Sequence, residues 1–215
     1  MRDHYHEALD AIGADLVEMT RLVGSAMDRA TTALIDADLA LAESVIAADE
    51  QIDRLQKGLE ARAFELLALQ QPVATDLRVI VTSLRMSADL ERMGDLARHV
   101  AKLARLKYPE SAIPAEFRST ILEMAQVASR IVAKAGSVIA HHDIAGAVEL
   151  EKDDDEMDRL HRQLFTMLLE PGPQQRIEVA IDLTLCGRFY ERFADHAVSV
   201  ARRVVYLVTG EYAAT

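Results

Sequence analysis

Acidic residues four positions apart recur in this chain, in pairs that could bind a cation. Glu91 and Asp95 lie in the stretch Glu-Arg-Met-Gly-Asp, and one hundred positions later Glu191 and Asp195 lie in Glu-Arg-Phe-Ala-Asp. Residues with this spacing share one face of a helix, where like charges repel each other by about 0.2–0.5 kcal/mol. A bound cation would neutralise such a face, so both pairs are candidate metal ligands.

Two further pairs have the same spacing and precede these in the chain. The full set of candidate metal ligands is Asp49, Asp53, Glu91, Asp95, Asp154, Asp158, Glu191 and Asp195. These eight residues supply eight of the net eleven negative charges of the chain. Carboxylate oxygens of this kind suit hard or borderline cations, and the set predicts polynuclear sites holding iron, zinc, manganese or magnesium.

The elements that carry these pairs are expected to be helices. Apolar residues recur at steps of three and four along most of the chain. Half of the residues are hydrophobic, tryptophan is absent, and there are only nine glycines and five prolines. The pattern predicts an all-α protein whose six long antiparallel helices cover about 5–35, 39–70, 74–107, 116–140, 144–169 and 174–208, with Asp38 as the N-cap of the second.

The second half of the chain repeats the first. Shifted by 105 positions, Asp49 through Leu55 fall on Asp154 through Leu160, and in the third helix the shift becomes 100. We interpret the chain as a tandem duplication of a three-helix bundle. The first bundle is expected to span 1–108 and the second 115–215, joined by a linker at 109–114 that a proline bounds at each end.

A hairpin of the second and third helices places the acidic pairs of a unit at one height. Asp53 and Glu91 each lie nineteen residues from Pro72, hence about 28 Å along their helices at a rise of about 1.5 Å per residue. Asp49 is level with Asp95 to within one residue. The five-residue deletion in the second unit falls around its turn, at Pro171-Gly172-Pro173, so its four acidic residues stay level as well. Four carboxylates are therefore expected to converge in each unit.

A second interpretation of the clusters needs no metal. Arg54, Arg92, Arg159 and Arg192 directly follow acidic residues of the pairs and could form arginine–carboxylate networks that hold each hairpin together. A buried diiron site of the ferritin type is disfavoured, because such sites use Glu-x-x-His motifs and the chain contains none.

The third helix also predicts how deep the site lies. Its apolar stripe includes Met86, Met93 and Val100, so Glu91 and Asp95 face away from the core. We therefore expect a shallow site between helices at the surface.

Three histidines lie near the acidic pairs. His99 and His161 could reach a metal, but their equivalents in the repeat are Ser199 and Gln56, and His196 points off the acidic face. Because the repeat does not echo them, we expect all three to be surface residues or to support the ligands from outside.

Charge and composition exclude some functions. A net charge of −11 argues against a nucleic-acid partner, which needs a concentrated basic surface. The single cysteine and the lack of a basic-then-apolar leader favour the cytoplasm. No apolar run approaches the roughly 20 residues that span a bilayer, so we expect membrane contact only peripherally, through partners.

The chain resembles the PhoU family of bacterial phosphate-transport regulators. The resemblance rests on the duplicated unit, the Gln-Pro-Val-Ala-Thr-Asp-Leu-Arg turn at 71–78 and the Glu-Arg-x-x-Asp blocks at 91–95 and 191–195. It implies two three-helix bundles, often assembled as homodimers, with surface metal clusters at the acid-x-x-x-Asp motifs. The second unit has Pro-Gly-Pro-Gln-Gln-Arg at 171–176 in place of that turn. If the turn contacts a partner, only the first unit is expected to make the contact.

The resemblance further implies a negative regulator of phosphate uptake and of the phosphate-starvation response. Such a protein has no enzymatic activity and links the ATPase subunit of a phosphate ABC transporter to a membrane sensor histidine kinase. Two alternatives remain open: a carboxylate-bridged metalloenzyme that hydrolyses phosphoesters, and a purely structural helical interaction protein.

Overall fold

The computed structural model describes residues 2–170 and 177–211, leaving out the side chains of 2–4 and 6. The described residues form six long helices, namely α1 (Arg2–Asp36), α2 (Leu39–Gln70), α3 (Ala74–Lys107), α4 (Arg118–His141), α5 (Ile144–Leu169) and α6 (Ile177–Thr209), and one 3-10 turn, η1 (Ala115–Phe117). The predicted all-α fold is confirmed. The turn expected at Pro171-Gly172-Pro173 and the helix start expected at 174 lie outside the described residues.

Two equivalent turns show the duplication in atomic detail. The Asp38 carboxylate accepts a hydrogen bond from the Leu41 amide at 2.9 Å and caps α2. Asp143 accepts one from the Gly146 amide at 3.1 Å and caps α5. The residue before each cap adopts a left-handed conformation, with φ of 53° and 52°. The prediction that Asp38 is an N-cap is therefore confirmed, and the equivalent residue of the second unit, Asp143, is an N-cap as well.

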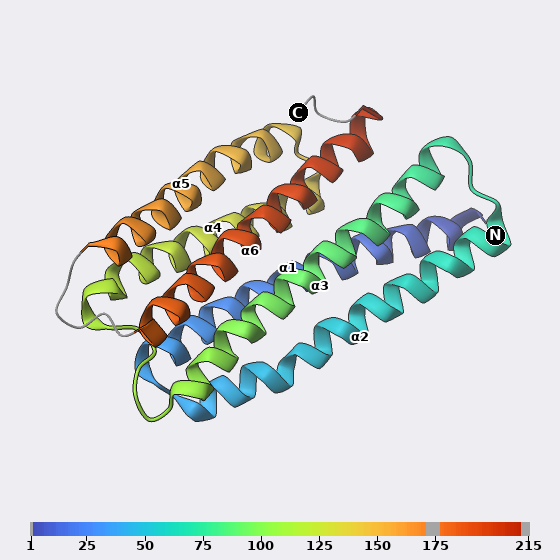
Figure 1. Ribbon diagram of the computed structural model, residues 1–215. Coiled ribbons are helices and arrows are strands. Elements are labelled where there is room, and N and C mark those ends of the chain that lie inside the picture. Colours follow the sequence, from blue (N-terminus) through green and yellow to red (C-terminus); the bar gives the residue numbers. More distant parts are fainter. Residues whose placement is uncertain (1, 171–176, 212–215) are drawn as a thin grey trace.

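The helices form two three-helix bundles that lie side by side (Figure 1). Within the first bundle α2 packs on α1 and α3, and within the second α5 packs on α4 and α6. The bundles meet where α1 contacts α4 and α3 contacts α6. As a result α2 and α5 lie at opposite outer edges of the molecule, and the acidic pairs face each other across α2–α3 and α5–α6.

Helices α3 and α6 run antiparallel across the boundary between the units. Near one end Lys107 Nζ lies 2.6 Å from Asp182 Oδ2. Nearer the middle Arg203 Nε lies 2.7 Å from Asp89 Oδ2. This pairing puts the residues around 94 opposite those around 195, so both acidic clusters lie at a similar height along the interface.

One continuous hydrophobic core runs through both units. It includes buried residues from all six helices and also Ala112 and Ile113 of the connecting segment. A buried hydrogen bond between the hydroxyls of Thr31 and Tyr190, 2.6 Å apart, joins α1 to α6 inside it. The division into units at 108 and 115 stays a prediction. None of the described helices is long and apolar enough to cross a bilayer.

Candidate functional site

The hairpins bring the four carboxylates of each unit together, as the distances from the turns predicted. Burial raises the pKa of Glu91, and the charges of Asp95, Asp53 and Asp49 raise it further. All four carboxylates of the first unit therefore lie within electrostatic reach of one another. We call these four the first cluster.

The four carboxylates of the second unit converge in the same way. The pKa of Asp154 is raised to about 6, first by burial and then by repulsion from neighbouring carboxylates that include Asp195, Asp158 and Glu191. We call these four the second cluster. In this respect the two units behave as the duplication implies.

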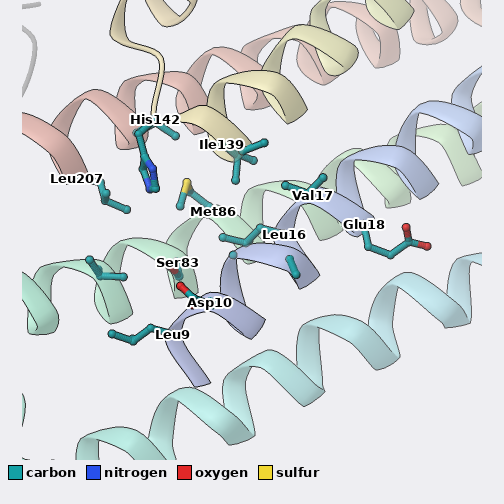
Figure 2. A pocket seen from close by; sticks show the side chains of 15 residues that line it. Leu9, Asp10, Leu16, Val17, Glu18, Ser83, Met86, Ile139, His142 and Leu207 are labelled. Carbon is teal, nitrogen blue, oxygen red and sulfur yellow. The ribbon is translucent and has the colours of Figure 1, made fainter. Parts of the chain in front are cut away.

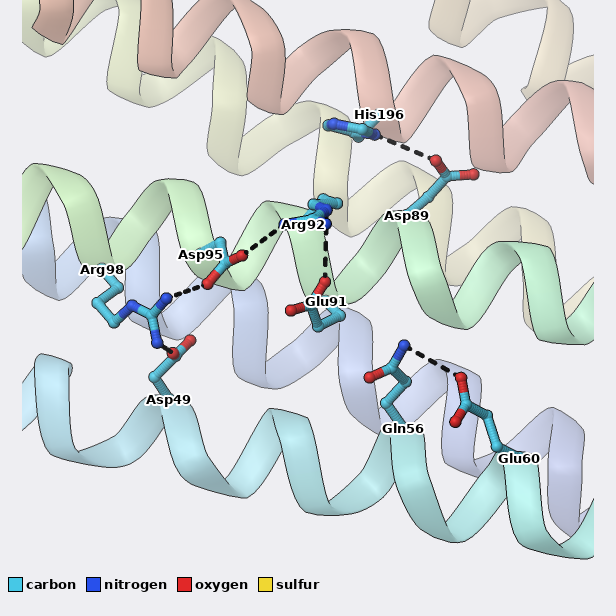
Figure 3. A network of polar contacts seen from close by, with 9 residues as sticks. All are labelled: Asp49, Gln56, Glu60, Asp89, Glu91, Arg92, Asp95, Arg98 and His196. Atoms are coloured by element: carbon cyan, nitrogen blue, oxygen red, sulfur yellow. Dashed lines mark hydrogen bonds and ion pairs between the residues drawn. The ribbon is translucent and has the colours of Figure 1, made fainter.

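An arginine holds the first cluster together. Arg98 of α3 reaches between the helices: its Nη1 lies 2.5 Å from Asp49 Oδ2, and its Nη2 contacts Asp95 Oδ1. Figure 3 shows the guanidinium between these two carboxylates. Arg92 adds a contact of 3.1 Å to Asp95 and one of 3.7 Å to Glu91. Part of the negative charge is thus already neutralised by the chain itself.

The first cluster lies deeper than the apolar stripe of α3 suggested. The Asp49 side chain is only 6% exposed, so the predicted shallow site is wrong for this residue. The cause is Gly94, which lets α2 approach α3 closely: a Cβ there would lie 2.9 Å from Ile52 Cδ1 and 3.2 Å from Asp49 Oδ1. Spacing along a sequence does not show how closely two helices approach.

The second cluster lacks the bridging arginine. Among the described residues, Asp154 and Asp195 form no ion pair or hydrogen bond. Glu191 is contacted by Arg188, and Asp158 lies 3.8 Å from Arg162, but both arginines are more than half exposed. The carboxylates that face each other across α5 and α6 are left without a cation between them.

Two buried polar atoms beside this cluster have no hydrogen-bond partner: Glu191 Oε2 and His161 Nε2. The His161 ring packs against Phe165 with ring centroids 4.9 Å apart. Gly187 of α6 makes room for the ring, because a Cβ there would lie 3.2 Å from its Cδ2 and 2.6 Å from Leu164 Cδ2. Buried polar atoms without partners are rare and point to a missing ligand or water.

The donor chemistry of the clusters fits a metal ion. Carboxylate oxygens and an imidazole nitrogen are ordinary ligands of iron, zinc and manganese, and the two unpartnered buried atoms could accept such bonds. Within the described part of the chain, no group of three or more histidine, cysteine, aspartate or glutamate side chains is arranged so that it could hold a metal ion. A bound ion would have to draw these side chains together, and the assignment of the eight ligands stays a prediction.

The arginines that pair with the clusters are mostly not the expected ones. Of the four predicted, Arg92 forms ion pairs, whereas Arg159 donates to Gln163 at 3.2 Å. In the part of the chain that the structure describes, Arg54 and Arg192 form no ion pair with either cluster. Arg98 was missed, although its position three residues after Asp95 was a usable signal.

The other two histidines, His99 and His196, contact residues outside the two acidic clusters. His99 packs against Phe189 across the boundary between units, with ring centroids 5.3 Å apart. His196 Nδ1 lies 3.1 Å from Asp89 Oδ1. The prediction that His196 points off the acidic face is confirmed.

A cavity of about 640 Å³ lies away from the clusters, among α1, α3, α4 and α6. Apolar side chains such as Leu16 form most of its wall, and Asp10, Ser83 and His142 supply polar groups (Figure 2). Among the described residues, no hydrogen bond joins Ser83 to His142 or to Asp10.

The hairpin ends expose large apolar side chains. At the α2–α3 turn Leu69, Val73 and Leu77 are exposed, with Val73 at 75%. Near the opposite end of the molecule, Leu169 and Ile177 of the second unit are more than three-quarters exposed. Exposed apolar groups of this size are typical of surfaces that meet a partner.

Comparison with known proteins gives concordant results. The family model described as PhoU domain matches twice, over residues 16–104 and 121–204. The chain is 50% identical over 212 residues to the phosphate-specific transport system accessory protein PhoU homolog 2 of Mycobacterium tuberculosis (strain ATCC 25618 / H37Rv), covering 99% of this chain and 100% of the relative. It is 47% identical to PhoU homolog 1 of Mycobacterium leprae, over 99% of this chain and 96% of the relative.

Solved structures agree with these sequence relatives. The crystal structure of PhoU from Pseudomonas aeruginosa is 30% identical and covers 96% of this chain and 100% of its own, with a TM-score of 0.86. That of the phosphate transport system regulatory protein PhoU from Streptococcus pneumoniae is 26% identical and covers 98% of this chain and 100% of its own, with a TM-score of 0.88. The similarity therefore spans both units.

Proposed function

Because the chain belongs to the PhoU family, we propose that it is a non-enzymatic adaptor that restrains phosphate uptake and the phosphate-starvation response. Its partners are the ATPase subunit of a phosphate ABC transporter and a sensor histidine kinase. The observation that carries this proposal is the full-length similarity to phosphate-specific transport system accessory proteins. On this proposal the chain acts in the cytoplasm as a homodimer and reaches the membrane only through its partners.

The α2–α3 turn is the surface through which the first unit contacts the transporter ATPase. Gln71 and Ala74 adopt left-handed conformations, with φ of 45° and 48°, on either side of Pro72 and Val73. This turn points apolar side chains into solvent at the end of the α2–α3 hairpin. Leu77 continues the same apolar surface into the first turns of α3. Burying these groups against a partner supplies the driving force for association.

The acidic clusters serve this function by fixing the hairpins. The carboxylates that the arginines of the chain do not neutralise repel one another across the facing helices, and a metal ion supplies concentrated positive charge to neutralise them. The residues that would hold such ions are the eight named from the sequence. A hairpin fixed in this way presents its turn to a partner in one orientation, at a lower entropic cost of binding.

Deleting the gene tests the regulatory role. In phosphate-replete medium, the deletion strain is expected to take up labelled phosphate faster than the parent, and a plasmid copy is expected to restore the lower rate. An unchanged uptake rate and an unchanged starvation response would contradict the proposal. Phosphoester hydrolysis by the purified protein that disappears in Asp95→Ala would instead favour the metalloenzyme.

A further inference from the structure

The boundary between the two units has two ends, which the duplication makes equivalent. At one of them, which we call the closed end, residues 108–117 connect α3 to α4, and their side chains Ala112, Ile113 and Phe117 are at most 5% exposed. At the other, which we call the open end, the last turns of α6 meet the first half of α1. The cavity of about 640 Å³ lies there (Figure 2).

The sequence explains why only one end is filled. With the repeat shifts of 105 and 100, Gly13 and Ser83 of the cavity wall are equivalent to Arg118 and Leu183 of the closed end. A Cβ on Gly13 would meet nothing within 4 Å. In addition, α1 is helical over 3–12, whereas the equivalent residues 108–117 leave the α-helical conformation. The cavity is thus the space that larger side chains and a connecting segment take up at the closed end.

The closed end also shows which bonds are missing at the open end. There, Arg118 Nη2 donates a hydrogen bond to the Ile35 carbonyl in the last turn of α1. The equivalent of Ile35 is Ala140 in the last turn of α4, which lines the cavity. Carbonyls at a helix C-terminus have no partner within the helix. Among the described residues, no hydrogen bond reaches the Ala140 carbonyl.

Two polar side chains of the cavity wall lack partners as well. The Ser83 residue is only 3% exposed, and its hydroxyl forms no hydrogen bond with the described residues. Such groups are rare in folded proteins. Asp10 forms no ion pair in the same part of the chain, and the lining residues include no lysine or arginine. The wall therefore offers acceptors and negative charge to a ligand that brings a cation, and a planar guanidinium suits such a set.

We propose that this cavity docks a peptide segment of a partner protein, in which apolar side chains precede an arginine as they do at 111–118 of this chain. The arginine donates to the Ala140 carbonyl and pairs with Asp10, and the apolar side chains pack on Leu16 and Met86. The cavity is within the range of about 300–1,000 Å³ that is usual for ligand sites. This inference does not rest on the proposed function, because it adds a docking site separate from the α2–α3 turn.

The first test uses the connecting segment itself as the probe. The peptide Ser-Ala-Ile-Pro-Ala-Glu-Phe-Arg, blocked at both ends, is titrated into the full chain with labelled methionine methyl groups. The Met86 methyl resonance is expected to shift saturably, with a Kd below about 1 mM. Alanine in place of the peptide's arginine is expected to weaken binding by about tenfold or more, as loss of a hydrogen bond to a charged group does. An unshifted Met86, or equal binding of both peptides, would overturn the proposal.

Two variants give the open end the residues of the closed end. Gly13→Arg and Ser83→Leu are each expected to occupy the cavity and to abolish peptide binding. Gly58→Arg is the matched control, because a Cβ on Gly58 of α2 also meets nothing within 4 Å and the residue lies outside the cavity wall. It is expected to bind the peptide as wild type does, and circular dichroism checks the fold of all three. Unchanged binding in Gly13→Arg and Ser83→Leu would contradict the assignment of the site.

The last test separates a partner from the chain's own C-terminus. Residues 212–215, Tyr-Ala-Ala-Thr, contain no basic side chain and so do not supply the proposed chemistry. Tyr212→Ala is therefore expected to bind the peptide as wild type does, and clearly tighter binding would identify the C-terminus as the occupant and overturn the partner assignment. Selection from random displayed peptides is expected to enrich an arginine after apolar residues on wild type but not on Gly13→Arg. Binders without this arginine would overturn the chemical class.

Discussion

Asp89 of α3 and Arg203 of α6 form an ion pair across the boundary between the repeat units, with Nε 2.7 Å from Oδ2. His196 of α6 lies 3.1 Å from the other carboxylate oxygen. Two side chains of the second unit thus hold one carboxylate of the first, whose side chain is only 13% exposed. This contact fixes the register of α3 against α6.

Replacing Asp89 by asparagine is expected to destabilise the protein by about 1.5–3 kcal/mol, because Arg203 would lose a charged, largely buried hydrogen-bond partner. The measurement is the free energy of unfolding in urea at pH 7. Arg202→Gln is the matched control on the same helix. Arg202 pairs with Glu151 at an exposed site, so that change is expected to cost less than about 1 kcal/mol. Similar losses in both variants would contradict the role given to Asp89.

The same carboxylate predicts how stability depends on pH. Burial alone would raise the pKa of Asp89, but hydrogen bonds from His196 and Arg203 outweigh it and lower the pKa below its usual value. The unfolded chain therefore binds this proton more readily than the folded protein. The stabilisation that the ionised Asp89 carboxylate provides is fully present above about pH 4. It is lost as the pH falls through the pKa that Asp89 has in the folded protein. The stability difference between wild type and Asp89→Asn should shrink over that acidic range.

For Asp154 in the metal-free protein, we expect stability to depend on pH in the opposite direction. Burial and neighbouring carboxylates raise its pKa to about 6, so the folded state keeps a proton that the unfolded chain releases near pH 4. Stability should fall as the pH rises from about 4 to 6. Asp154→Asn removes this penalty and is expected to raise Tm at pH 7 in chelator. A lower Tm under those conditions would show that the carboxylate already has a stabilising partner.

Arg98 is expected to stabilise the first unit strongly. Arg98→Val would leave the buried Asp49 carboxylate without its ion-pair partner, at a cost of about 3 kcal/mol. Chemical denaturation in chelator measures it, with Arg162→Val as the control at an exposed pair of 3.8 Å in the second unit. If both variants unfold at the same urea concentration, the bridge adds no stability.

Much of the fold follows from local patterns in the sequence. The three- and four-residue apolar steps located the six helices to within a few residues where they are described. Counting from Pro72 placed Asp49 level with Asp95, and Arg98 contacts both carboxylates. Asp38 was recognisable as a cap because its side chain can accept a hydrogen bond from the first turn of the helix.

The depth and the asymmetry of the clusters did not follow from those patterns. Asp49 is buried because Gly94 lets two helices approach closely, a tertiary effect that acid-x-x-x-acid spacing does not encode. Arg98 was missed because only the arginines directly beside the acidic pairs were considered, and His161 was set aside because its equivalent in the repeat is Gln56. Neither Arg98 nor His161 has an equivalent in the other unit. In the structure, those missing echoes are the features that distinguish one cluster from the other.

The most direct test of the regulatory account measures binding of the purified protein to the ATPase subunit of its own phosphate transporter. Leu77→Asp changes the exposed surface beside the α2–α3 turn, and Ile177→Asp makes the same change at the equivalent position of the second unit. The account predicts that Leu77→Asp weakens binding by tenfold or more, about 1.4 kcal/mol, while Ile177→Asp binds as wild type does. Wild-type protein that does not bind the ATPase, or a loss of the same size in both variants, would contradict it.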